Sequence, residues 1–384
     1  MDLINAKILL YLDYPDIVNA CIALLAFTKV CETPYFWVLK AKQDFSIPAN
    51  ELQLVPGSSN QERYKFIYNI KDPNVGLIEA AKLGILSLVE YFLKLGADLN
   101  KEALRWAAAN GHFDVVKYLV EQRANVHRRY TAVPSAQYLH ANDECALGLA
   151  SKHGHLDVVK YLVEQGADLH DRDELALIYA ANNGHLNVVK YLVEQGANLH
   201  ASDEAALRTA ADYGRLDVVK YLVEQGANLH TWDEWALRWT AAGNGHLDLV
   251  KYLVEQGANL HASDEEALRT AASYGRLDVV KYLVEQGADL RVRDEEALRW
   301  AARNGRLDVV KYLVEQGANL HAENEEALRR AAENGHLDVV KYLVERGADL
   351  HANNEEALRQ AAGDDQHAVV KYLVEQGANT SYLN

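Results

Sequence analysis

Fifteen histidines are the side chains in this 384-residue chain with the clearest capacity for chemistry. Imidazole binds zinc and exchanges protons near neutral pH. One set follows a recurring glycine, but arginine, which is not a zinc ligand, takes the same place in other copies. His155, His185, His246 and His336 thus alternate with Arg215, Arg276 and Arg306. We therefore expect structural and solvent-facing roles for this set, and no metal site.

A second set of histidines recurs at a regular interval, at His170, His200, His230, His261, His321 and His351. If each interval is one layer of packed helices, neighbouring layers lie about 10 Å apart. Zinc–nitrogen bonds are only about 2 Å long, so two such side chains cannot share one ion. This spacing again predicts no metal ion, and nothing in the sequence calls for a cofactor.

Other catalytic patterns are missing from the sequence. We find no glycine-rich phosphate loop, no nucleophile elbow and no carboxylate pair that stands apart from the recurring phrase. Glu265 and Glu266 lie four and three residues before Arg269, which predicts pairing on one helix surface worth a few tenths of a kcal/mol. The sequence therefore predicts a protein that is not an enzyme.

Composition restricts the classes of partner. The formal net charge of −16 argues against nucleic acid, because phosphate contacts need clustered lysine and arginine. No apolar run reaches the roughly 18–20 residues of a membrane span, and no signal peptide is visible. Cys21, Cys31 and Cys145 form no CxxC pair, so we expect three reduced, small buried residues in a cytoplasmic protein.

The elements that carry these side chains are copies of one unit. The phrase G-H/R-L-D-V-V-K-Y-L-V-E-Q-G-A-N/D-L recurs, with its first glycine at Gly84, Gly111, Gly154, Gly184, Gly214, Gly245, Gly275, Gly305 and Gly335. From Gly154 on, the spacing is 30, 30, 31, 30, 30 and 30 residues, and a tenth copy has Asp365 for the glycine. One copy cannot bury its own apolar face, so we predict an all-α solenoid of about ten helix-turn-helix units over residues 75–384.

Residues 264–293 illustrate the unit. Ser263 or Asp264 can cap the first helix, and Ser263-x-x-Glu266 fits a capping box. Gly275 suits the left-handed residue that ends this helix. A second helix starts near Asp278 and stops at Gly287.

These elements resemble the ankyrin-repeat family, in the phrase A-A-x-x-G-H/R-L-D-V-V-K-Y-L-V-E-x-G-A-D/N. The family unit has about 33 residues and opens with T-P-L-H, whereas this unit opens with E-A-L-R and is shorter in the connection, which predicts tight loops in place of hairpin fingers. A 30-residue unit of this wording is similar to the ankyrin families of giant DNA viruses that infect amoebae. That resemblance implies a viral protein that acts inside a host cell.

Two copies are irregular. An insertion of about 13 residues, 128–140, carries a proline, three basic residues and two tyrosines, and is either a tolerated surface loop or a contact loop. The last copy carries His367 and Asp365 in place of the usual leucine and glycine, as expected for a capping unit with a more polar exposed side.

Residues 1–74 lack the phrase. Residues 1–45 predict three short helices around an apolar core, and residues 46–74 predict a linker with one short helix near 61–70. The pattern I-L-x-Y-L-D, then P-D-I, then F-W resembles an F-box, although the usual leading Leu-Pro-x-Glu is missing. The resemblance implies contact with the Skp-type adaptor, and through it the cullin, of a ubiquitin ligase, carried by Ile8, Leu9, Leu12, Pro15, Ile17 and Trp37. The alternative is a helical cap on the first repeat.

Recognition in a repeat array is expected at the positions that vary between copies. The family resemblance puts the first helix and the connection on the concave side. Aromatic residues gather there, mostly in the middle copies, and are either binding residues or fillers between units: Trp106, Tyr179, Tyr213, Trp232, Trp235, Trp239, Tyr274 and Trp300. We predict a monomeric interaction scaffold that recruits a host protein to a ubiquitin ligase, or alternatively a plain scaffold or competitor.

Overall fold

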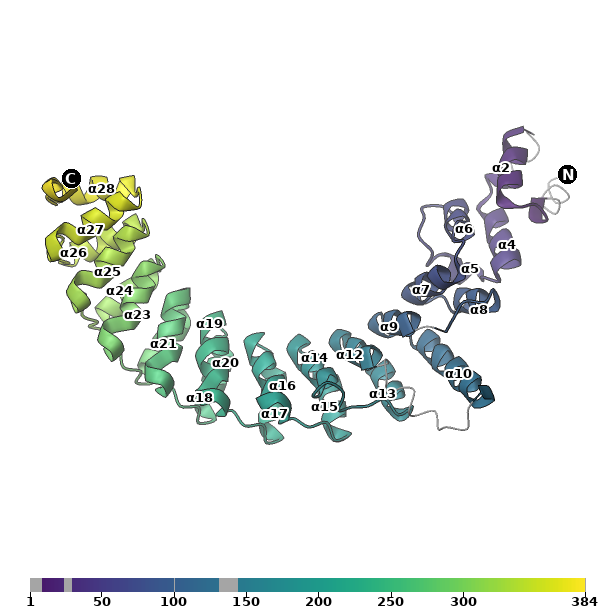
Figure 1. Ribbon diagram of the computed structural model, residues 1–384, viewed down its shortest axis with the longest axis horizontal. Helices are drawn as coiled ribbons and strands as arrows, with labels where there is room; N and C mark the ends of the chain where they lie inside the picture. Colours follow the sequence, from purple (N-terminus) through teal and green to yellow (C-terminus); the bar gives the residue numbers. More distant parts are fainter. Residues whose placement is uncertain (1–8, 24–29, 100, 131–143, 384) are drawn as a thin grey trace. The chain divides into compact units, whose positions relative to one another are not determined.

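The computed structural model describes residues 9–23, 30–99, 101–130 and 144–383. In these ranges the secondary structure is helical and no strand occurs, which confirms the all-α repeat fold (Figure 1). None of the described helices combines the length and apolar composition that a membrane crossing requires. Residues 131–140 of the insertion and Ile8 lie outside the described residues.

The chain packs as two compact bodies, and we describe each by itself. Body 1 comprises residues 1–180 and 187–197, and body 2 comprises residues 181–186 and 198–384. This division falls inside the repeat array, whereas the sequence suggested boundaries near residues 45 and 74.

Body 1 begins with four helices, α2 (Tyr14–Ala23), α4 (Pro34–Phe45), α5 (Ala49–Leu52) and α6 (Asn60–Tyr68). Aromatic rings form their core, with the Tyr64 ring 5.4 Å from that of Trp37 and 5.0 Å from that of Phe45. Burial raises the pKa of the Tyr64 hydroxyl, and its hydrogen bond to Asp44 raises it further. The predicted short helix near 61–70 is present as α6.

Residues 46–74 pack closely, although the sequence predicted a linker. Ile47, Leu52 and Ile67 are buried in this region. Glu51 accepts hydrogen bonds from the Ser87 hydroxyl at 2.6 Å and the Ser87 amide at 3.3 Å, and Ser87 belongs to the first repeat. The physical reason is the apolar content of the segment, which folds against α4 and the first repeat rather than remaining in solvent.

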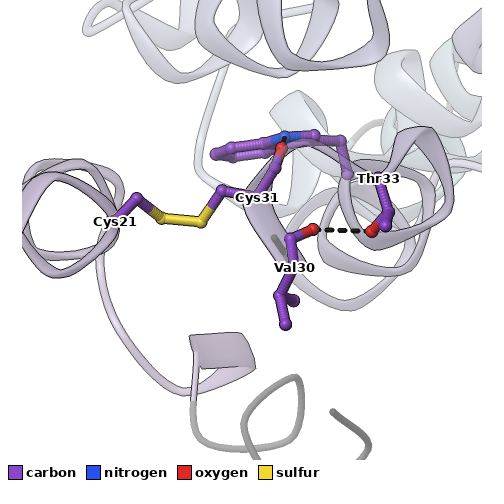
Figure 2. The surroundings of a disulfide bond; sticks show 5 residues. Cys21, Val30, Cys31 and Thr33 are labelled. Atoms are coloured by element: carbon purple, nitrogen blue, oxygen red, sulfur yellow. Dashed lines mark hydrogen bonds between the residues drawn. A yellow bond between two sulfur atoms is a disulfide. The ribbon is translucent and has the colours of Figure 1, made fainter. Parts of the chain in front are cut away.

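Cys21 and Cys31 form a disulfide bond (Figure 2). Their Cα atoms lie 6.3 Å apart, within the usual range for such bonds. The expectation of reduced cysteines is therefore wrong for this pair. The expectation failed because spacing along the sequence does not show that the end of α2 lies beside the residues that precede α4.

Ten repeats follow, each with a first and a second helix. In body 1 they begin with α7 (Pro73–Leu83) and α8 (Leu86–Lys94), α9 (Lys101–Ala109) and α10 (Phe113–Tyr130), and α12 (Glu144–His153) and α13 (Leu156–Glu164). The fourth pair is α14 (Leu175–Asn183) and α15 (Leu186–Glu194). Insertion residues 128–130 extend α10, which is twice as long as the other second helices of these pairs (18 against 9 residues).

Body 2 contains the remaining six pairs. Their helices are α16 (Ala201–Asp212) and α17 (Leu216–Glu224), α18 (Thr231–Trp235) with η1 (Ala236–Ala241) and α19 (Ala242–Asn244), then α20 (Leu247–Glu255), α21 (Ala262–Tyr274), α22 (Leu277–Glu285), α23 (Val292–Arg303), α24 (Leu307–Glu315), α25 (Ala322–Glu333), α26 (Leu337–Glu345), α27 (Ala352–Gly363) and α28 (His367–Glu375). A short turn, η2 (Thr380–Leu383), ends the described chain.

Within each body, first helices stack on first helices, and second helices on second helices (Figure 1). The alanine pair of most first helices is buried, as at Ala271 and Ala272, and small side chains allow close approach. Val279, Val280 and Leu283 of the second helix are buried against them. The 3.6-residue period therefore places the apolar face of each repeat against its neighbours.

The interchange of histidine and arginine after the glycine has a structural cause. Most of these side chains donate an N–H to a backbone carbonyl of the preceding repeat, as in Arg276 Nε to Gly243 O at 3.0 Å and His336 Nε2 to Arg303 O at 2.9 Å. The glycine also makes room, because a Cβ on Gly305 would lie 2.6 Å from a ring nitrogen of His336. This set of histidines holds repeats together.

The connections are tight, as expected, but their backbone was not foreseen. Three consecutive residues adopt left-handed angles in seven connections, such as Ser263 to Glu265 with φ of 48°, 56° and 58°. Non-glycine residues enter this region at a cost of roughly 1–2 kcal/mol each, with Asp and Asn the most tolerant. The middle residue is Asp or Asn in every case, as at Asp264 and Asn324. The predicted capping box at Ser263 is wrong, because Ser263 is left-handed and α21 has no side-chain cap.

A buried glutamate closes each of these left-handed turns. In six connections the histidine four residues earlier donates its Nδ1 hydrogen to this glutamate over 2.5–2.6 Å: Glu174, Glu204, Glu234, Glu265, Glu325 and Glu355. In the seventh, Arg291 replaces the histidine before Glu295, and burial raises the pKa of Glu295. The second set of histidines is therefore bound to carboxylates, and within the described ranges no three His, Cys, Asp or Glu side chains could hold a metal ion.

These His–Glu contacts predict greater stability at mildly acidic pH. The hydrogen bonds that His170 and His351 donate to Glu174 and Glu355 raise the pKa values of these two histidines. A histidine whose pKa is raised on folding contributes stability that is fully present below its unfolded pKa of about 6.5 and is lost as pH rises through the folded pKa. We expect a higher unfolding midpoint by calorimetry at about pH 6 than at about pH 8.5.

A control variant with H170R and H351R copies the arginine found at residue 291. Arginine stays charged throughout this range, so the variant should show a smaller change in unfolding midpoint with pH. An equal change in variant and wild-type protein would assign the pH dependence to other groups.

Candidate functional site

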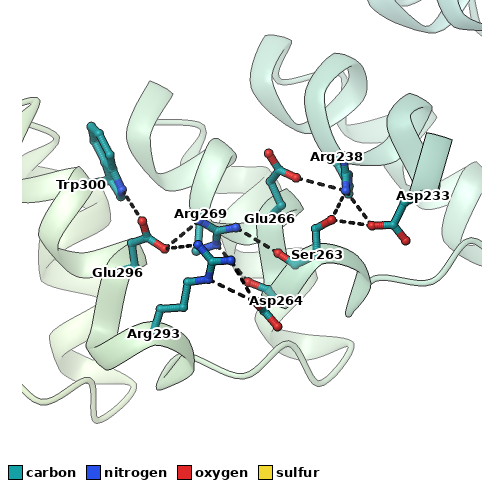
Figure 3. Close-up of polar contacts among 9 residues, drawn as sticks. All are labelled: Asp233, Arg238, Ser263, Asp264, Glu266, Arg269, Arg293, Glu296 and Trp300. Carbon is teal, nitrogen blue, oxygen red and sulfur yellow. Dashed lines mark hydrogen bonds and ion pairs between the residues drawn. The ribbon is translucent and has the colours of Figure 1, made fainter.

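On the first helices of body 2, ion pairs link one repeat to the next. From Arg238 on, the arginine of the A-L-R phrase in one repeat meets the glutamate directly before A-L-R in the next repeat, and we call these pairs the Arg–Glu ladder. Its members are Arg238–Glu266 at 3.2 Å, Arg269–Glu296 at 2.7 Å, Arg299–Glu326, and Arg329–Glu356 at 3.0 Å. Figure 3 shows the first two pairs and their neighbours.

The prediction that Arg269 pairs within its own helix is wrong. Arg269 reaches Glu296, which lies 27 residues further along the chain. These glutamates are half-buried between repeats, and Arg299 and Arg330 lower the pKa of Glu326 although burial alone would raise it. The ladder therefore serves the packing between repeats and leaves little free charge.

The repeat with 31 residues differs from its neighbours in backbone. Its extra residue is accommodated by η1 (Ala236–Ala241), a π-helical turn inside the first helix. Such wide turns are rare and occur frequently at functional sites. Trp235 precedes this turn and Trp239 lies within it, so the bulge sets how the two rings are presented.

A groove of about 370 Å³ lies at this bulge, and we call it the tryptophan groove. It is formed by three consecutive repeats of body 2 and is lined by Arg208, Thr209, Asp212, Trp232, Trp235, Trp239, Gly243, Asn244 and Tyr274. Trp232, Trp239 and Tyr274 are 54%, 42% and 49% exposed, and Trp235 is half-buried. The groove therefore presents large aromatic surfaces to solvent.

The aromatic rings of the groove hold one another. The Trp235 and Trp239 rings stack with centroids 6.0 Å apart, and Trp232 meets the Trp235 ring edge-on at 5.8 Å. The Trp232 indole N–H donates to Asp203 Oδ2 at 3.3 Å. Gly243 leaves one wall bare, since a Cβ there would come within 3.2 Å of Thr270.

Polar groups border the groove on two sides. The Asn244 amide donates to the backbone and the carboxylate of Asp212, at 2.9 and 3.0 Å. The Arg208 guanidinium lies 4.3 Å above the Trp232 ring and donates to the Ser202 carbonyl at 3.3 Å. Arg208 and Asp212 were not among the binding residues predicted from the sequence. The 31-residue spacing and the tryptophan in place of glutamate at residue 235 were the available signals.

Two smaller hollows continue along the same helices. One of about 270 Å³ lies between Trp239, Tyr274 and Trp300, and one of about 160 Å³ lies beside Trp300 and Arg330. Trp300 donates its indole N–H to Glu296 Oε1 at 3.0 Å. The first helices from α16 to α25 thus carry a row of hollows. The side chains that line these hollows change from mainly aromatic to mainly charged along the chain.

The structure brings together four of the eight predicted binding residues, Trp232, Trp235, Trp239 and Tyr274, in the tryptophan groove. Trp300 lies in the adjoining hollow, and Tyr213 is exposed at the end of α16. Trp106 and Tyr179 belong to body 1, on α9 and α14. The groove in body 2 is therefore the strongest candidate site in the part of the chain that the structure describes.

The residues predicted to bind a ubiquitin-ligase adaptor lie mostly inside the N-terminal region. Leu9, Ile17 and Trp37 are buried, Leu12 is half-buried and Pro15 is exposed. Trp37 donates its indole N–H to the Cys31 carbonyl at 2.7 Å. The side chains of Leu9, Ile17 and Trp37 contribute to the core of body 1, which leaves less of them available to a partner.

The family model for ankyrin repeats (3 copies) matches residues 77–173, 169–233, 228–294 and 298–384. These matches cover nearly all of the ten helix pairs and well over half of the chain. No curated protein matches the chain.

Proposed function

The chain belongs to the ankyrin-repeat family of protein-interaction scaffolds, and we propose that the first helices of body 2 hold its protein partner, with the tryptophan groove at the centre. The observation that carries this proposal is the exposure of Trp232, Trp239 and Tyr274 around one groove. Tryptophan and tyrosine are enriched among residues that dominate binding energy. An exposed aromatic cluster of this kind is costly in water unless a partner covers it.

Site-specific crosslinking tests this proposal. A photoreactive phenylalanine analogue in place of Tyr274 would lie in the groove, whereas one in place of Lys281 would lie on the second helix of the same repeat. After irradiation in a lysate of the native host cell, we expect one discrete protein adduct from residue 274 and none from residue 281. Equal adducts from both positions, or none from either, would overturn the proposal.

The ubiquitin-ligase role remains a prediction for residues 1–45. Contacts between α5 and the first repeat, through Glu51 and Ser87, favour the alternative in which the N-terminal helices cap the array. A viral origin and a host target are likewise predictions from resemblance. Calorimetric titration of the full chain with a purified Skp-type adaptor separates the two roles, because a cap gives no heat of binding.

A further inference from the structure

Arg208 occupies the place of a ladder arginine but lacks the carboxylate. Arg238, Arg269, Arg299 and Arg329 each meet a glutamate of the next repeat, whereas the corresponding residue for Arg208 is Trp235. No described carboxylate lies within 4.0 Å of Arg208. The ladder is thus interrupted at the tryptophan groove.

The contacts of Arg208 satisfy only part of its guanidinium. The Trp232 ring covers one face of the group at 4.3 Å, and the Ser202 carbonyl accepts one N–H. A guanidinium has five N–H donors in its plane, and stacking on a ring uses none of them. The side chain is half-buried and lines the groove, so a ligand in the groove can reach the remaining donors.

The nearby carboxylates do not fill this gap. Asp212 lines the groove and accepts the Asn244 amide, and Asp203 accepts the Trp232 indole N–H. Within the groove lining, Arg208 and Asp212 are the two charged side chains. A ligand with one carboxylate placed at Arg208 would complete the ladder geometry, in which arginine and carboxylate lie 2.7–3.2 Å apart in three pairs.

We propose that the tryptophan groove binds a peptide segment of the partner that places an Asp or Glu side chain against Arg208 and an adjacent apolar side chain on Trp235, Trp239 and Tyr274. The carboxylate takes the position that glutamate holds in the other rungs, and the apolar side chain covers the stacked rings. This inference rests on the proposed function, since it names the chemistry of the partner at the same groove. Charge-assisted hydrogen bonds of arginine to carboxylate supply the specificity.

A phage library of random peptides, selected on the full chain, tests the inference. We expect enrichment of peptides with an acidic residue beside an aromatic or aliphatic one. The leading peptide, amidated at its C-terminus so that only side-chain carboxylates remain, is then compared by calorimetry with its Glu-to-Gln and Glu-to-Lys forms. The acidic form should bind about tenfold or more tightly than the Gln form, because a charged hydrogen-bond partner is lost.

Three variants of the chain sharpen the test. R208Q should weaken the acidic peptide about tenfold or more and leave the Gln peptide unchanged. W235E restores the missing rung inside the protein, so it should also abolish the preference for the acidic peptide. R359Q is the matched control, since Arg359 occupies the position that corresponds to Arg208 in the last repeat, far along the chain from the groove, and should leave binding unchanged.

Equal binding of the Glu and Gln peptides, tighter binding of the Lys peptide, or an unchanged affinity in R208Q would overturn the inference. Failure to select any peptide that depends on Trp235 would do the same. A crosslinked partner at residue 274 combined with no preference for the acidic peptide would leave the proposed function intact. It would refute only the inference that an Asp or Glu side chain binds Arg208. No crosslink at residue 274 would refute the proposed function itself.

Discussion

Replacing Trp235 and Trp239 by alanine together should weaken the partner captured at residue 274 by about a hundredfold or more. Each tryptophan has the character of a binding hot spot, whose truncation costs about 2 kcal/mol or more. The two rings stack on each other at 6.0 Å and form the middle of the groove, so their loss removes its aromatic surface. Calorimetry or surface plasmon resonance with the purified partner measures the effect.

The same double variant should unfold at nearly the wild-type temperature. Trp239 is 42% exposed and Trp235 half-buried, so truncation removes few core contacts, and the loss should stay below about 2 kcal/mol. The matched control is W106A, which truncates a similarly exposed tryptophan in the first helix of another repeat, in body 1. A large drop in unfolding temperature would show that these rings are packing residues. Equal weakening of binding by W106A would show that the loss is not specific to the groove.

The repeat fold was predictable because the same sequence pattern recurs in every copy of the unit. A period of 30 residues, a glycine after each first helix and valines in each second helix all recur, so a chance match in one copy is corrected by the others. Gly275 with φ of 76° ends α21 as predicted. Stacking then follows, because a single repeat cannot bury its apolar face.

The same periodicity hid the partner of each arginine in the Arg–Glu ladder. A glutamate lies three residues before Arg269 in its own helix and another lies 27 residues after it, and the two occupy the same place in consecutive copies. Spacing along the sequence cannot distinguish these two pairings. Packing decides in favour of the second, because adjacent first helices bring Glu296 to 2.7 Å from Arg269.

The left-handed connections were missed for a different reason. Three successive non-glycine residues at positive φ are unfavourable in isolation, so propensity argues against them. They occur because a side-chain hydrogen bond between a buried glutamate and a histidine stabilises the turn, as between Glu265 and His261. The recurring H-x-x-[DN]-E pattern was a readable signal, since Asp and Asn tolerate this conformation. The disulfide between Cys21 and Cys31 had no such repeated signal.

Replacing Glu204 by alanine should lower the free energy of unfolding by about 2–3 kcal/mol, the cost of losing hydrogen bonds to a charged group. Glu204 is buried and left-handed, and its Oε1 accepts His200 Nδ1 at 2.6 Å and the Asn228 amide of the next connection at 3.1 Å. Alanine removes both bonds and leaves the amide of Asn228 without that acceptor. Urea denaturation followed by circular dichroism measures the change.

E204Q provides the control, because glutamine keeps an oxygen acceptor in the same place. Its second polar atom would replace Oε2, which is buried and has no hydrogen-bond partner among the described residues, so E204Q should lose less stability than E204A. A repeat array is quasi-one-dimensional, with each interface coupling only neighbouring repeats. Weakening the interface at Glu204 should therefore also broaden the unfolding transition or divide it in two. A single transition with unchanged midpoint in E204A would mean that the buried glutamates do not hold the connections.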